Sequence, residues 1–102
     1  MKLLKENGYQ KFRIPQGEFA DHLLQKKIYI DFLEENLYIN AYVYDPDEVR
    51  PVRSVEFSFQ RDGGEDCIKI KLFGYEESDL SSQKLEDIEE KAINLYTYSE
   101  YA

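Results

Sequence analysis

Two stretches of alternating apolar and polar residues pair as hairpins, and both pairings sort their side chains onto the same two faces of one sheet. The first hairpin sets Ile28–Leu33 against Tyr38–Val43 around a Glu35-Asn36 turn. One face carries the pairs Ile28 with Val43, Ile30 with Ala41 and Phe32 with Ile39. The other carries Tyr29 with Tyr42, Asp31 with Asn40 and Leu33 with Tyr38. Because a one-residue slip would move every side chain across the sheet, this agreement favours one core face and one tyrosine-bearing face.

The second hairpin spans residues 55–75 and turns at Gly63-Gly64, where glycines suit the positive φ angles of a tight turn. The core face then receives Phe59 opposite Ile68, Phe57 opposite Ile70 and Val55 opposite Leu72. The outward pairs are Gln60 with Cys67, Ser58 with Lys69 and Glu56 with Lys71. Both hairpins together predict four strands.

One helix is expected before these strands in the sequence and a second one after them. The C-terminal helix begins near Asp79 or Ser82, either of which can cap it. Its apolar residues fall within an arc of about 100° and should cover the face of Ile28, Ile39, Phe57 and Ile70; they are Leu85, Ile88, Ala92, Leu95 and Tyr96. Apolar pairs four residues apart predict a short helix over residues 16–26. Residues 9–14 alternate as an edge strand that Pro15 ends, and residues 1–8 are a loose lead-in.

The expected fold class is therefore α+β. A four- to five-stranded antiparallel meander sheet carries the C-terminal helix on one face, with a short N-terminal helix. Residues 1–102 form a single domain, because 42% hydrophobic residues in a chain of this length supply one modest core.

The net charge of -8 limits the classes of partner. Non-specific nucleic-acid binding and adhesion to anionic membranes both depend on excess Lys and Arg, so neither is expected. A basic protein surface is the partner that this charge favours. The first seven residues are too polar for a secretory signal, no apolar run approaches a membrane span, and Cys67 is the single cysteine. These features predict a cytoplasmic protein, in the producing cell or in a host cell.

The sequence offers no recognisable catalytic constellation, so we expect no enzyme, no catalytic residues, no metal and no cofactor. His22 and Cys67 are a candidate nucleophilic pair only if they meet in space. Acidic residues gather at the two ends of the predicted sheet, which leaves a weak divalent-cation site and a metal-dependent hydrolase as a third alternative. One end holds Glu34, Glu35, Asp62, Glu65 and Asp66, and the other holds Asp45, Asp47, Glu48, Glu76, Glu77 and Asp79.

The face predicted to point away from the C-terminal helix is rich in aromatic residues. It would display Tyr29, Leu33, Tyr38, Tyr42, Tyr44, Phe73 and Tyr75, beside lysines. Either residues 1–26 fold over this face, or it stays open as a contact surface larger than monomers usually expose. A second copy of the chain and a different protein are both suitable partners for an open face. Single-stranded nucleic acid, which stacks on such platforms, is disfavoured by the net charge.

The C-terminal quarter is the most acidic part of the chain. Residues 76–102 carry eight acidic residues against Lys84 and Lys91. Glu86, Glu89 and Glu90 are predicted to dock on a basic partner, with Tyr29, Tyr38, Tyr42, Tyr44 and Tyr75 as further contact residues.

Together these features predict a non-enzymatic, acidic protein-binding module that works by steric block. Its size and charge suit a small inhibitor or neutralising protein, such as a phage or mobile-element antagonist of a host nuclease or defence complex, or a toxin's immunity partner. The alternative is a self-associating structural or accessory protein that forms a homodimer through the tyrosine face.

Overall fold

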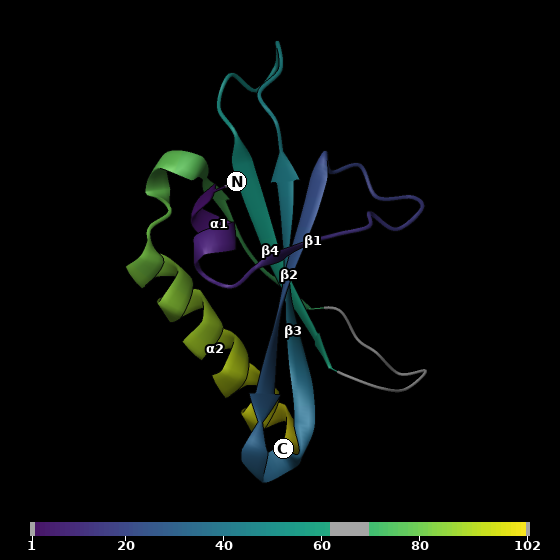
Figure 1. Ribbon diagram of the computed structural model, residues 1–102, viewed down its shortest axis with the longest axis vertical. Helices are drawn as coiled ribbons and strands as arrows, with labels where there is room; N and C mark the ends of the chain where they lie inside the picture. Colours follow the sequence, from purple (N-terminus) through teal and green to yellow (C-terminus); the bar gives the residue numbers. More distant parts are fainter. Residues whose placement is uncertain (1, 62–69, 102) are drawn as a thin grey trace.

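Five antiparallel strands form one sheet in the order β1-β2-β3-β4-β5, and a long C-terminal helix lies along one side of it (Figure 1). A computed structural model describes residues 2–61 and 70–101, and their side chains except those of residues 32, 61, 70–73 and 96–101. The elements are α1 (Lys2–Glu6), β1 (Gln10–Phe12), β2 (His22–Ile30), η1 (Asp31–Leu33), β3 (Glu35–Tyr44), β4 (Ser54–Arg61), β5 (Ile70–Glu76), η2 (Glu77–Asp79) and α2 (Ser82–Tyr101). The predicted α+β meander with a C-terminal helix and a short N-terminal helix is confirmed.

The core lies between the sheet and the helices. On the sheet, alternate residues of β3 and β4 point toward α2 and are buried: Leu37, Ile39, Ala41, Val43, Val55, Phe57 and Phe59. Leu85, Ile88 and Ala92 of α2 pack against them, and the same cluster includes Leu4 of α1, Tyr9, Leu24, Ile30 and Leu80. We call this side of the sheet the helix side and the opposite side the outer face. The predicted sorting of isoleucine and phenylalanine beneath the terminal helix is confirmed for the described side chains.

The register of the first hairpin differs from the predicted one. Ile28 lies opposite Leu37, six residues before its predicted partner Val43, and Tyr29 lies opposite Asn36 instead of Tyr42. Residues 31–33 form a 3-10 turn rather than strand, and Glu34 closes it with a φ of 53°. Because the shift is an even number of residues, it leaves each strand side chain on its predicted face.

The helix predicted over residues 16–26 does not form. Residues 22–26 instead begin β2, which pairs with both β1 and β3. A spacing of four residues places side chains on one face of a strand as well as on one face of a helix, so the pattern fitted both. The short N-terminal helix is α1, where a loose lead-in was predicted, and β1 lies within the edge strand predicted for residues 9–14.

A β-bulge alters the second hairpin. Phe59 pairs with Ile70 and Ser58 with Lys71, but Phe57 pairs with Phe73, so the register shifts between Phe57 and Ser58. The residues of β5 that follow the bulge therefore lie on the face opposite to the predicted one. The predicted Glu56–Lys71 pair is wrong, because Glu56 lies opposite Gly74. The predicted Gly63-Gly64 turn lies outside the described residues.

Helix α2 begins one residue after its cap. The backbone N–H of Lys84 donates to the Ser81 hydroxyl oxygen at 3.1 Å, so Ser81 caps the helix and neither predicted residue does. Leu85, Ile88 and Ala92 are buried as predicted, whereas Leu95 is 41% exposed. Tyr96 belongs to the helix, but its side chain lies outside the described set.

Candidate protein-binding surfaces

The outer face is closed at the end where β2 begins. Tyr42 is 6% exposed and packs with Leu23 and Ala20, and Ile14 and Tyr44 lie against this cluster. Ala20 and Ile14 come from the segment that links β1 to β2, so this segment covers part of the sheet. The alternative in which N-terminal residues fold over the tyrosines therefore holds for this end of the face.

Tyr44 lies at the edge of the closed end and is held by two contacts. Its hydroxyl donates to a Glu56 carboxylate oxygen at 3.2 Å, and the Arg50 guanidinium lies 5.6 Å from its ring centroid. Partial burial, followed by the Glu56 carboxylate, raises the pKa of Tyr44 above its ordinary value. This tyrosine is part of a local network and is half-buried.

The other end of the outer face is open. Tyr29 on β2 is 56% exposed there. Phe12 on the edge strand β1 is 54% exposed as well, but it lies opposite Leu23, beside the closed end. Between the strands lies a hollow of about 450 Å³ lined by Gly8, Gln10, Phe12, Gln25, Lys27 and Tyr38. Gln25, one of these lining residues, donates to the side-chain carbonyl of the buried Asn40 at 2.8 Å. Among the five predicted contact tyrosines, whose side chains the structure describes, only Tyr29 is exposed.

Tyr75 does not belong to the outer face. After the bulge it lies opposite Val55, and its ring meets Phe57 edge-on with centroids 6.2 Å apart. The ammonium group of Lys84 on α2 lies 5.1 Å from the Tyr75 ring centroid. The prediction that Tyr75 projects away from the helix is wrong, because the bulge moves it to the helix side.

The three predicted docking glutamates of α2 have different surroundings. Glu86 and Glu90 are exposed. Glu89 accepts a hydrogen bond from the ammonium group of Lys26 at 2.7 Å, and the two side chains are only 14% and 27% exposed. Lys26 also lies 5.9 Å from the centroid of the buried Tyr9 ring. Glu89 therefore ties α2 to β2, which leaves Glu86 and Glu90 as the freely accessible pair.

The Tyr9 hydroxyl shares this environment. Burial, followed by the charge of Glu89, raises the pKa of Tyr9 far above its ordinary value. The phenol thus stays neutral beside the ion pair, and the three side chains join the α1–β1 connection, β2 and α2.

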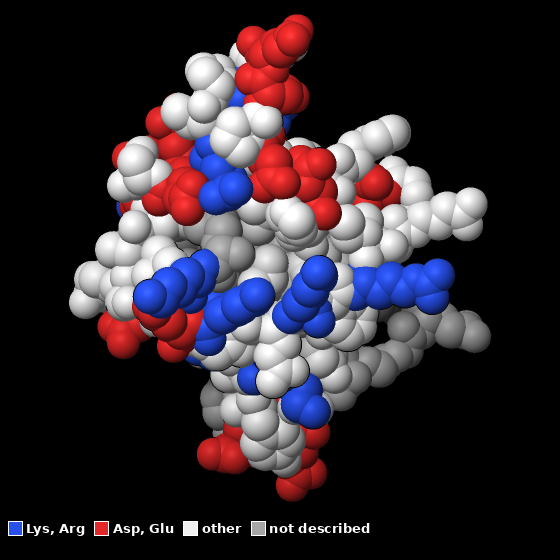
Figure 2. All heavy atoms as spheres, turned by 45° about the horizontal axis from the view of Figure 1, so that its top comes forward, with Lys and Arg blue, Asp and Glu red and all other residues white. Residues whose placement is uncertain are grey.

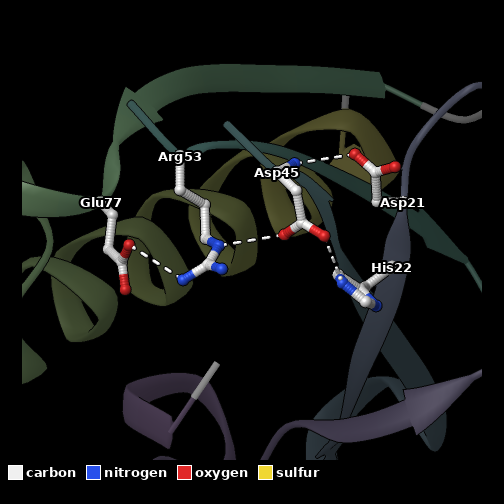
Figure 3. A network of polar contacts seen from close by, with 5 residues as sticks. All are labelled: Asp21, His22, Asp45, Arg53 and Glu77. Atoms are coloured by element: carbon white, nitrogen blue, oxygen red, sulfur yellow. Dashed lines mark hydrogen bonds and ion pairs between the residues drawn. The ribbon is translucent and has the colours of Figure 1, made fainter. Parts of the chain in front are cut away.

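At the end of the sheet where β2 begins, the guanidinium group of Arg53 joins two acidic residues (Figure 3). Arg53 Nε donates to Asp45 at 3.1 Å, and Arg53 Nη1 donates to Glu77 at 3.3 Å. His22 Nε2 lies 2.9 Å from the second Asp45 oxygen, and the Asp45 backbone N–H donates to Asp21 at 2.7 Å. Although desolvation acts in the opposite direction, hydrogen bonds from His22 and Arg53 lower the pKa of Asp45.

These carboxylates are thus used to connect strand ends. Within residues 2–61 and 70–101, no group of three or more His, Cys, Asp or Glu side chains is placed to hold a metal ion. Cys67, the candidate partner of His22 in a nucleophilic pair, and the acidic residues 62–66 lie outside the described residues.

Comparisons with protein-family models, with curated proteins and with solved structures found no match. Among the described helices, none has the length and apolar character needed to cross a bilayer.

Proposed function

We propose that the protein is a non-enzymatic binding module that covers a basic surface of a partner protein with the acidic face of α2. The observation that supports this most is the exposed pair Glu86 and Glu90. Like charges four residues apart weaken a helix by about 0.2–0.5 kcal/mol, so this arrangement does not serve helix stability. Opposite charge on a partner would relieve the repulsion and speed association.

The acidic surface extends beyond these two residues. Glu76, Glu77 and Asp79 are exposed in the segment that leads into α2, and Asp87 is exposed within it. Arg53 already pairs with Glu77, so the remaining carboxylates supply most of the charge. Steric block of a nuclease, a defence complex or a toxin fits a small acidic domain of this kind, and we propose an inhibitor or neutralising role in the cytoplasm on that basis.

The test begins with the partner, captured from the native host on the immobilised protein and identified by mass spectrometry. The double variant Glu86→Lys/Glu90→Lys is then expected to weaken binding to the purified partner by about tenfold at low salt, mainly through a slower association rate. Surface plasmon resonance at several salt concentrations measures both effects. Because both side chains are exposed, the thermal unfolding temperature should stay close to that of the wild type.

A matched control reverses two exposed carboxylates elsewhere, in Glu34→Lys/Glu48→Lys. This variant has the same net charge but leaves α2 intact, so its affinity should stay near the wild-type value. Equal losses in both double variants, or an affinity that salt does not change, would contradict docking through α2.

A homodimer is a second candidate, favoured by the open end of the outer face. Tyr29 exposes large aromatic surface there, and Phe12 exposes it on the edge strand, where it lines the hollow of about 450 Å³. If the protein dimerises through this face, Tyr29→Glu should convert it to a monomer in size-exclusion chromatography with light scattering. A wild-type protein that is monomeric at high concentration would exclude this candidate.

A further inference from the structure

A pocket between α1, β1 and the start of β2 is lined by three side chains that can carry positive charge. Its volume is about 160 Å³, and its lining residues are Lys5, Lys11, His22 and Leu24. It lies on the helix side of the sheet, near the edge strand.

The fold brings these residues together from three elements. Lys11 on β1 lies opposite Leu24 on β2, and His22 precedes Leu24 by two residues, so all three share one face. Leu4 is fully buried in the core and anchors α1, and Lys5 follows it. Core packing therefore sets the backbone positions of the three residues, while the Lys5 and Lys11 side chains are exposed and reach the pocket from the surface.

The His22 ring is fixed by the polar network described above. Its Nε2 atom is held by Asp45, while the second ring nitrogen points away from that carboxylate (Figure 3). The other oxygen of Asp45 is neutralised by Arg53. Among the described residues, none hydrogen-bonds this second nitrogen, so it can bind a ligand in the pocket.

The N-terminal part of the chain, which supplies all the pocket residues, has a net positive charge, whereas the whole chain is acidic. Residues 1–27 contain six basic and three acidic residues, whereas the full chain has a net charge of -8. Lys and Arg side chains form a band across the middle of one face, with carboxylates above and below it (Figure 2). Among the described residues, neither Lys5 nor Lys11 has a carboxylate within ion-pair distance, whereas Lys2 pairs with Glu6 at 3.8 Å.

We propose that this pocket binds a tetrahedral oxyanion, a phosphate or sulfate group, through Lys5, Lys11 and the second ring nitrogen of His22. Lysine ammonium groups bind such anions as point charges with three donors each. A singly protonated phosphate has both acceptor oxygens and a hydroxyl donor, so it can pair with His22 in either protonation state. The site is independent of the acidic surface of α2 and of any protein partner.

The test is a titration of the ¹⁵N-labelled protein with inorganic phosphate, followed by NMR at constant ionic strength. We expect saturable shifts of the Lys5, Lys11 and His22 amides. Lys11→Gln should weaken phosphate binding by about tenfold, because it removes one charge-assisted hydrogen bond. The matched control is Lys2→Gln, which also removes one positive charge, but from a residue of α1 that does not line the pocket. This variant should bind phosphate with unchanged affinity.

Two further titrations identify the source of the anion. Tighter binding of phenyl phosphate than of inorganic phosphate would assign the site to a phosphorylated ligand, and the reverse order would assign it to the free ion. Shifts that do not saturate, or that Lys2→Gln and Lys11→Gln reduce equally, would overturn the proposal. The spectra of both variants also show whether each remains folded.

Discussion

Replacing Glu89 with Lys is expected to lower the free energy of unfolding by about 3 kcal/mol. The change breaks the 2.7 Å ion pair with Lys26 and brings a second ammonium group next to it, where both side chains are largely removed from water. The neutral Tyr9 hydroxyl and ring offer no anion to replace the carboxylate. In a domain of this size, such a loss shifts the midpoint of thermal unfolding by roughly 15 °C, which circular dichroism measures directly.

Glu86→Lys is the matched control for this prediction. It makes the same charge change on the same helix, but its side chain is exposed, so the free energy of unfolding should change by less than about 0.5 kcal/mol. Glu89→Gln should lie between the two, because the amide oxygen can still accept a hydrogen bond from Lys26. Equal stabilities of Glu86→Lys and Glu89→Lys would contradict the structural role of this ion pair.

This difference also decides how binding experiments are interpreted. A loss of partner affinity in a variant that includes Glu89→Lys would combine partial unfolding with lost contact. The sequence placed all three glutamates in one docking group, although Glu89 is four residues after Leu85 and three before Ala92. That spacing puts it beside the buried stripe, and its partner Lys26 was assigned to a helix that does not form.

The faces of the sheet were predictable because side-chain direction depends only on whether a residue number is odd or even along a strand. The register was not, because it depends on the turn. A 3-10 turn ending in a positive φ at Glu34, where no glycine or asparagine signals it, lies outside the usual hairpin patterns. The bulge near Phe57 also has no recognisable sequence signal. This bulge by itself moves Tyr75 to the helix side.

The basic pocket was missed for a different reason. Acidic residues outnumber basic ones in the whole chain and also in each of two large parts, residues 1–75 and residues 76–102. The excess of Lys and Arg in residues 1–27 appears only at a finer division. Its gathering into one site further depends on α1, which has five residues and no strong sequence signal.

Replacing Tyr42 with Glu is expected to destabilise the fold by about 4 kcal/mol or more, a large share of the stability of a typical domain. Tyr42 packs between Leu23 and Ala20 with only 6% of its surface exposed. A carboxylate at this position would be removed from water and would lie opposite Glu56 on the next strand. Urea unfolding followed by circular dichroism should show a much lower midpoint.

Tyr29→Glu makes the same chemical change on the same face, at its open end. Tyr29 is 56% exposed and lies opposite Asn36, so the loss should stay below about 1 kcal/mol. Only this variant therefore tests a contact surface, since any loss of association in Tyr42→Glu would follow from unfolding. A Tyr42→Glu protein with the wild-type urea midpoint would show that residues 14–20 do not cover the sheet, and the closed end of the outer face would then be available to partners as well.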